Sequence, residues 1–342
     1  MRKRTWKQDE RERRLAYFSL REAQSVTKET LQRRKRMRPE RGKVYGAYVV
    51  ASPTHLRFHG GPTVRKKFEK FLGEISEALE AGRVVRLDFS KTERLFPCGM
   101  LLLMGALDSW LEVYPPVKLT ATYPQNDLVE QMLQSAGVLQ RLSLSHRKAI
   151  THDDVTRWHQ FEGHNVDASI IAPFMERVSE ATGKEWQLGL GDCVAEALTN
   201  VKKHAYEGSG PAHWWMFATV NHDKRQVFVA MHDRGATIPG TLLAKPDWID
   251  TLSLRRLRRG GDCELISAAV GGRTRTKLYY RGKGLPEMLE FTARHTQNAL
   301  AIYSRNGYFM ANNAGTTQLK GALAQPVDGT LVIWTLNFGE KA

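Results

Sequence analysis

One short helical pattern, residues 196–206 (EALTNVKKHAY), constrains the fold of this chain more than any other feature. Glu196, Asn200 and His204 recur at spacings of four, so they lie on one face of a helix. The opposite face carries an apolar stripe that must face a hydrophobic core; it consists of Val194, Leu198, Val201 and Ala205. Such a helix packs on one side and presents a polar row on the other, either to solvent or to a ligand.

Size and composition favour a two-domain protein with no membrane span. The 342 residues suffice for two cores, and the hydrophobic content of 42% is ordinary for a globular chain. The apolar runs are too short for a transmembrane helix, and the charged N-terminus lacks the apolar segment of a secretory signal. Cys98, Cys193 and Cys263 form no CxxC pair, which favours a reducing, cytoplasmic location over a disulfide framework or a cysteine zinc site.

The positive charge is concentrated in an N-terminal arm, residues 1–43. This arm holds 16 Lys or Arg against 6 Asp or Glu, so it carries +10 of the total net charge of +15. A basic arm of this kind can contact nucleic acid, anionic lipid or an acidic protein, or it can be a solvated, flexible or helical extension. The segment LQRRKRMRPERGK has no aromatic residue, so phosphate contact is a better expectation than base stacking.

Residues 44–143 alternate between strand and helix patterns. Two short strands are expected within 44–61, a helix over 64–82, a strand at 83–90, a helix over 99–115, a strand at 117–124 and a helix over 126–142 that breaks at Gly137. The first helix buries Phe68, Phe71, Leu72, Ile75 and Leu79. This order predicts a small α/β domain.

Residues 144–166 are polar and aperiodic and are predicted to be a linker. The histidines at 146, 152, 159 and 164 have spacings that match no metal motif, so we interpret them as ordinary linker residues.

A second domain is predicted over 167–342. Its first helix turns Ile170, Ile171, Phe174 and Val178 inward and is capped by Gly183. The EALTNVKKHAY helix follows from about Leu188. Two strands, 213–221 and 226–233, then form a hairpin. A polar, Gly- and Arg-rich stretch at 240–282 is expected to be a lid or disordered. A helix at 284–296, a hairpin over 298–310 turning at Asn-Gly, and a strand at 329–338 complete the domain.

Three signals within this second domain occur in a specific order. The first is the polar row on the helix. The second is HDRGATIPG, in which Asp233 ends an apolar strand and Gly235 follows two residues later. The third is RGKGLPEM, where Gly282 and Gly284 precede a helix, an arrangement suited to binding an anion.

That order resembles the Bergerat-fold (GHKL) ATP-binding domain of histidine kinases, gyrase-type topoisomerases, a heat-shock chaperone family and mismatch-repair ATPases. EALTNVKKHA resembles the family's N-box, DRGATIPG its first glycine box and GKGL its second. The EALTN…HAY wording is most similar to the anti-sigma-factor serine kinases. The resemblance covers 167–340 and implies an α/β sandwich, a mixed sheet with helices on one face.

The resemblance also implies roles for individual residues. Asn200 would coordinate Mg²⁺, the only metal ligand implied, and Glu196 would polarise the attacking water or substrate hydroxyl. Asp233 would accept a hydrogen bond from the adenine amino group of ATP, Gly235 would let the backbone approach the base, and Thr330 would bind near the adenine through water. Gly282 and Gly284 would let the lid fold over the phosphates, and Lys283 would add a point charge there. Lys203 and His204 would touch phosphate, with a purely structural role as the alternative for His204, and Leu285 completes the ATP-binding set.

Two positions depart from the family patterns. Thr237 stands where the first glycine box has its second glycine. In the N-terminal domain, VVRLDFSKTERLFPCGMLLLMGALDSWLE resembles the STAS fold of anti-anti-sigma factors, whose phosphoacceptor serine precedes a helix. Here Pro97 occupies the acceptor position and Cys98 follows it, so phosphorylation within the chain at this turn is not expected.

The expected function is an ATP-binding regulatory protein with Mg²⁺-dependent ATPase or serine/threonine kinase-like activity, coupled to a protein partner of the STAS or sigma-regulatory type. A homodimer is left open. The alternatives are a non-catalytic nucleotide-binding scaffold and a nucleic-acid-associated ATPase that uses residues 1–43. The presence of Glu196 weighs against the scaffold, because binding alone needs no general base.

Overall fold

A computed structural model describes residues 46–163, 168–205, 213–244, 259–272, 284–295, 297–312 and 315–339. The predicted basic arm, 1–43, lies outside these residues. Within them, no helix combines the length and apolar character that spanning a bilayer requires.

The N-terminal part is a small α/β unit around a parallel sheet. The sheet has the order β1 (Tyr48–Ala51), β3 (Val85–Asp88), β5 (Leu119–Thr122). A second parallel pair joins β2 (His55–Leu56) to β4 (Arg94–Leu95). The helices are α2 (Pro62–Glu80), α3 (Pro97–Val113), η1 (Pro116–Lys118), α4 (Asp127–Ser135) and α5 (Val138–Arg141).

The periodicity of α2 and the glycines near the helix ends account for these boundaries. Phe68, Phe71, Ile75 and Leu79 are buried as expected, whereas Leu72, predicted with them, is only partly buried at the edge of the stripe. Gly137 has a φ of 68°, which a glycine adopts without steric cost, so the chain breaks between α4 and α5 at the predicted residue.

The C-terminal part is built on one five-stranded sheet with the order β6-β7-β8-β10-β9, and every neighbouring pair in it is antiparallel. The strands are β6 (His159–Gly163), β7 (Trp214–Asn221), β8 (Gln226–Asp233), β9 (Ala299–Asn312) and β10 (Thr317–Asn337). The helices are η2 (Ala168–Ile171), α7 (Ala172–Thr182), α8 (Lys184–Asn200), η3 (Val201–Ala205), α9 (Ile238–Ala244), α11 (Asp262–Val270) and α12 (Gly284–Ala293).

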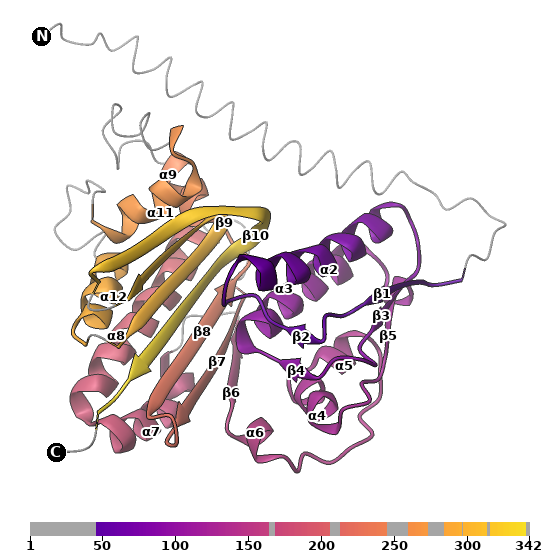
Figure 1. Ribbon diagram of the computed structural model, residues 1–342, viewed down its shortest axis with the longest axis horizontal. Helices are drawn as coiled ribbons and strands as arrows, with labels where there is room; N and C mark the ends of the chain where they lie inside the picture. The colour runs from indigo at the N-terminus through magenta and orange to yellow at the C-terminus, as the bar shows by residue number, and fades with distance from the viewer. Residues whose placement is uncertain are drawn as a thin grey trace, which may run out of the picture.

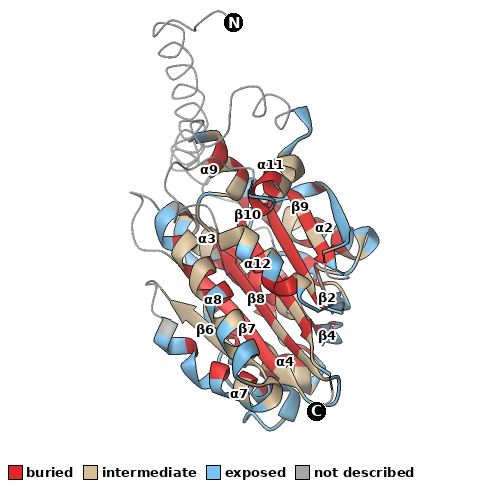
Figure 2. Ribbon diagram, turned by 90° about the vertical axis from the view of Figure 1, so that its left-hand side faces the viewer, coloured by how far each residue is buried: buried red, intermediate tan, exposed pale blue. Residues whose placement is uncertain are grey.

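The two parts form three layers, with the five-stranded sheet in the middle (Figure 1). Side chains alternate between the faces of a strand. Met216 and Val229 therefore pack beneath α7, α8 and α12, whereas Trp215 and Ala230 share a core with α3. Both faces of the central strands are buried, as Figure 2 shows for the side covered by α8. The N-terminal unit thus closes the second face of the sheet.

The mixed sheet expected for the C-terminal domain is therefore wrong for its described strands, which are wholly antiparallel. The chain as a whole is mixed α/β, because the parallel pairs occur in the N-terminal unit.

The predicted linker, 144–166, contains structure that the polar sequence did not indicate. It includes α6 (Asp153–Thr156) and the edge strand β6, which pairs with β7 from His159 to Gly163. Its first half is held to α4, because Thr151 N–H donates to Gln131 Oε1 at 2.8 Å. An edge strand pairs along one side only, so it needs little apolar patterning.

Several boundaries within 167–342 also differ from expectation. Ile170 is exposed rather than turned inward, and α8 begins at Lys184, earlier than Leu188. The stretch 240–282, expected as a lid or disordered, contains the end of α9 and the whole of α11; its segments 245–258 and 273–282 lie outside the described residues.

The predicted turn at Asn306–Gly307 is wrong, because β9 runs continuously through it. Pairing with β10 overrides the local turn signal, and the irregularity is absorbed by extra residues of β10 on either side of the Val327–Arg305 pair, where Arg305 has a φ of 54°. Gly307 is needed for another reason: a Cβ there would lie 2.6 Å from the backbone nitrogen of Cys263 in α11.

Candidate functional site

The α8–η3 helix has the two faces that its sequence predicts. Its apolar stripe is buried, including Val194 and Leu198, while Glu196 and Asn200 are half-buried on the other side. The helix ends in the π-helical turn η3, which is wider than an α-helical turn, so position 204 does not continue the four-residue row above Asn200. The His204 side chain lies outside the described atoms, and Lys203 is exposed.

Glu196 lies against the start of α12. A Cβ at Gly284 would be 2.5 Å from Glu196 Oε2, so the carboxylate lies directly against this glycine. Burial, followed by the negative charge of Glu287, raises the pKa of Glu196 above its usual value. A carboxyl group with a raised pKa at a helix N-terminus is well suited to accept a proton near neutral pH. The structure thus brings together the predicted N-box and the end of the second glycine box.

Asp233 occupies the end of β8 and is buried. The Gly235 N–H donates to its Oδ1 at 2.8 Å, and burial raises the pKa of the carboxyl to about 7. Gly235 itself lies against η3, since a Cβ there would be 2.2 Å from the Cβ of Ala205. Ala236 N–H also donates to the Ala205 carbonyl at 2.6 Å. Gly235 therefore allows the segment that follows β8 to dock on the end of the α8–η3 helix.

Thr330 lies directly across from Asp233 in the β8–β10 pair. Its hydroxyl is 2.9 Å from that of Ser304 on β9, and Ser304 Oγ also accepts the N–H of Ile238 at 3.0 Å. Sequence reasoning missed Ser304, because nothing in the local pattern of β9 marks it. Only the register of β9 with β10 brings this second hydroxyl beside the end of β8.

Of the remaining predicted residues, the structure describes Leu285 but not Gly282 and Lys283. Leu285 is half-buried and packs against the α9–α11 cluster, which indicates a packing contribution. Gly282 and Lys283 lie outside the described residues. Thr237, which replaces the expected second glycine, accepts the Gly240 N–H at 3.0 Å and so caps the N-terminus of α9.

The turn likened to the STAS phosphoacceptor position offers no accessible acceptor among its described residues. Pro97 is the first residue of α3, and Cys98 is buried, which raises the pKa of its thiol to about 12. A Cβ at Gly99 would lie 2.5 Å from the carbonyl oxygen of Leu56. Neither side chain at 97 or 98 offers an accessible hydroxyl or thiolate.

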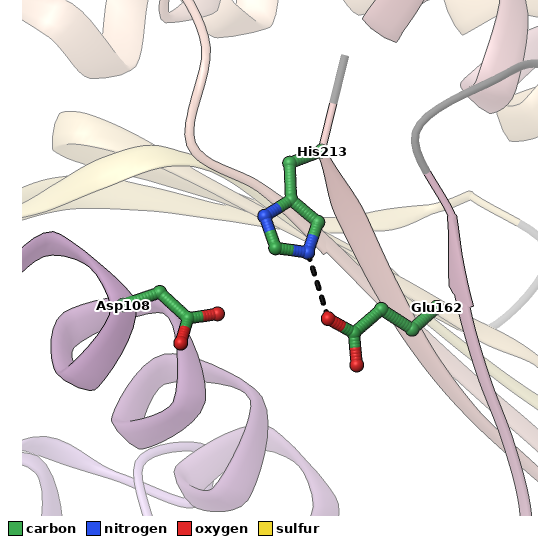
Figure 3. A group of neighbouring side chains, drawn as sticks. All are labelled: Asp108, Glu162 and His213. Carbon is green, nitrogen blue, oxygen red and sulfur yellow. Dashed lines mark hydrogen bonds and ion pairs between the residues drawn. The ribbon is translucent and has the colours of Figure 1, made fainter. Parts of the chain in front are cut away.

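A second cluster of titratable residues joins the two parts of the molecule. Asp108, Glu162 and His213 approach one another with ligand atoms within 4.8 Å, as Figure 3 shows. However, Arg141 donates to Asp108 Oδ1 at 2.8 Å and to Glu162 Oε1 at 3.0 Å, and His213 Nε2 lies 2.8 Å from Glu162 Oε1. The hydrogen bond with His213, together with the charge of Arg141, lowers the pKa of Glu162 to about 2. The cluster is a satisfied ion-pair network, and a metal ion would have to displace a guanidinium.

Comparison with known proteins gives no family assignment: no protein-family model matches this chain, and no curated protein matches it. The residues gathered around α8–η3 are therefore the basis for inferring a function.

Proposed function

We propose that this protein binds Mg-ATP between the α8–η3 helix, the end of β8 and the start of α12, and acts as an ATP-dependent regulatory ATPase or kinase. The observation that carries the proposal is the convergence of segments far apart in the sequence. Gly284 lies against Glu196 at one point of the helix, and Gly235 lies against Ala205 two turns further on. Asn200 lies on the helix between these two contacts.

The chemistry of these side chains fits a nucleotide. Asp233 accepts one hydrogen bond from Gly235, so its buried carboxyl retains acceptor capacity for an exocyclic amine such as that of adenine. The Thr330 hydroxyl can exchange a further hydrogen bond beside it, whereas the Ser304 hydroxyl, which also donates to the Gly329 carbonyl and accepts the Ile238 N–H, is fully used and positions Thr330. The amide oxygen of Asn200 is a suitable ligand for Mg²⁺, which would neutralise phosphate charge.

Glu196 is the residue best suited to activate a nucleophile. Its raised pKa favours proton acceptance from a water or a substrate hydroxyl. The closed turn at Cys98 favours a hydroxyl on a separate protein over one at this position in the chain. A kinase acting on another STAS-type protein and a slow ATPase switch are both consistent with this arrangement.

Calorimetric titration of Mg-ATP into the wild-type protein tests the proposal. We expect saturable binding that Asp233→Asn weakens by roughly 10- to 150-fold, the effect of about 1.5–3 kcal/mol for a hydrogen bond to a charged group. The matched control is Asp223→Asn in the exposed β7–β8 turn, which should bind as the wild type does. Absence of binding by folded wild type would overturn the nucleotide function, and binding without any turnover would favour a scaffold.

A further inference from the structure

At the end of β8, the side chains on the two faces of the sheet contact different parts of the molecule. Met231 lies in the core beneath α8, and the alternation of a strand places Asp233 on that same face. His232 and Arg234 instead contact α3 of the N-terminal unit. His232 lies against Gly105, where a Cβ would be 2.6 Å from the imidazole Cε1, and Arg234 donates two hydrogen bonds of 3.0 Å to Glu112. The two neighbours of the proposed adenine acceptor are therefore held by another part of the chain.

The segment of β10 opposite the end of β8, residues 328–330, also contacts both α3 and Asp233. The backbone carbonyl of Asp328 lies 2.9 Å from His232 Nε2, and its side chain accepts the Ser109 hydroxyl of α3 at 3.1 Å. The next residue, Gly329, has a φ of 83°, and a Cβ there would lie 1.8 Å from the Asp233 carbonyl oxygen. Thr330 follows and pairs with Asp233. Residues 328–330 therefore connect α3 to Asp233 through direct contacts.

On α3, Gly105, Ser109 and Glu112 are spaced four and three apart and so lie on one face of the helix. Burial lowers the pKa of His232 to about 4, so the imidazole between α3 and β8 is neutral at physiological pH. The contact is thus a packed, uncharged core with an ion pair at its rim. A displacement of α3 along the sheet must move His232 and Arg234, and with them the backbone that carries Asp233.

We propose that the docking of α3 on the sheet and the occupation of the site beside Asp233 are energetically coupled, so that the N-terminal unit is a built-in effector of that site. The nucleotide version of this coupling rests on the proposed function. By thermodynamic reciprocity, an effector that shifts α3 changes ligand affinity, and the ligand changes the docking of α3 by the same factor. Packed interfaces of this kind transmit small shifts because they are not continuously deformable.

Substitutions on α3 alone test the coupling without touching any residue of the site. Gly105→Ala forces a methyl group against His232 and should change the Mg-ATP affinity at least about fivefold. Its control is Gly73→Ala in α2, where a Cβ meets nothing within 4 Å and affinity should not change. If Gly105→Ala does not fold, Glu112→Arg replaces it, because it sets two positive groups together at Arg234. Its control is Glu74→Arg, which breaks the exposed pair with Lys70.

Hydrogen exchange separates this inference from the nucleotide function. Without any ligand, Asp233→Asn should alter amide exchange in α3 around residues 105–112 and leave α2 unchanged. If the wild type binds Mg-ATP but the α3 variants bind as it does, the coupling is overturned while the proposed function stands. If the wild type binds no nucleotide, the proposed function fails, and the exchange experiment decides the coupling: a change confined to α3 supports it, and identical exchange throughout overturns it.

Discussion

At the scale of single residues, two carboxyl groups distinguish this site from an ordinary helix–sheet interface. Asp233 and Glu196 both have raised pKa values, and in both cases burial is the largest cause. Burying a carboxyl group costs stability unless the charge is compensated, and carboxyl groups with such perturbed pKa values cluster at functional sites. Asp233 has a single backbone donor in Gly235, which leaves it poised for a further donor.

The first residue-scale prediction concerns Glu196. Glu196→Ala should lower ATP turnover by about 10²- to 10⁴-fold, the usual contribution of a general base, while calorimetric Mg-ATP affinity changes little. Glu290→Ala on the exposed side of α12 is the control and should retain full turnover. Full activity of Glu196→Ala in a phosphate-release assay would show that another group is the base.

The second residue-scale prediction concerns the pH dependence of stability. The folded-state pKa of Asp233, about 7, exceeds its ordinary value of 3.8, so its stabilising contribution is complete below pH 4 and is lost as pH rises through 7. At 1.36 kcal/mol per pKa unit, the loss is on the order of 4 kcal/mol. Asp233→Asn removes this loss, so urea unfolding should show its advantage over wild type growing from pH 4 to pH 8. A constant difference across that range would contradict the burial of an ionisable Asp233.

At the scale of elements, the long β9–β10 pair differs from the structure that the local sequence predicts. An Asn-Gly pair favours a two-residue hairpin turn, yet β9 continues through it because its partner strand supplies hydrogen bonds on the far side. Gly307 then permits α11 to approach the strand closely, since Cys263 N would be 2.6 Å from any Cβ. The same residue type that predicted a turn is required for packing instead.

Gly307→Ala tests this reading. We expect it to destabilise the protein by about 1–3 kcal/mol, because backbone rather than a flexible side chain blocks the added methyl group. Gly191→Ala in α8 meets nothing within 4 Å and should stabilise the helix by about 0.5–1 kcal/mol. Thermal unfolding measures the stability of both variants. A Gly307→Ala variant more stable than the wild type would show that the close approach of α11 to β9 does not require this glycine.

At the scale of the whole molecule, the two parts behave as one packed body because α3 covers the face of the sheet opposite α8. Trp215 and Leu331 on that face share a core with Leu101 and Leu107 of α3. Arg141 then links the edge of the sheet to the N-terminal unit, because it pairs with both Asp108 of α3 and Glu162 of β6. Figure 3 shows these two carboxylates together with His213.

Removing Arg141 should therefore weaken the whole structure. Arg141→Ala leaves the mostly buried Asp108 without its guanidinium and leaves Glu162 with His213 alone, so we expect a loss of about 3 kcal/mol in the free energy of unfolding by urea. The control, Lys70→Ala, breaks the exposed pair with Glu74 and should change stability by less than about 0.5 kcal/mol. Equal effects of the two variants would show that the network adds nothing to the joining of the two parts.

The sequence by itself determined the periodic elements and the identity of the candidate site residues. The stripe of α2, the break at Gly137 and the two faces of α8 follow from spacing, because helix and strand periods act over a few residues. The tertiary structure decided which of the candidates meet. It brought Gly284 to Glu196, added Ser304 beside Thr330, made an edge strand of part of the presumed linker, and replaced the turn at Asn306–Gly307 by a continuous strand. These outcomes depend on pairing and close approach between residues far apart in the chain, which no local pattern records.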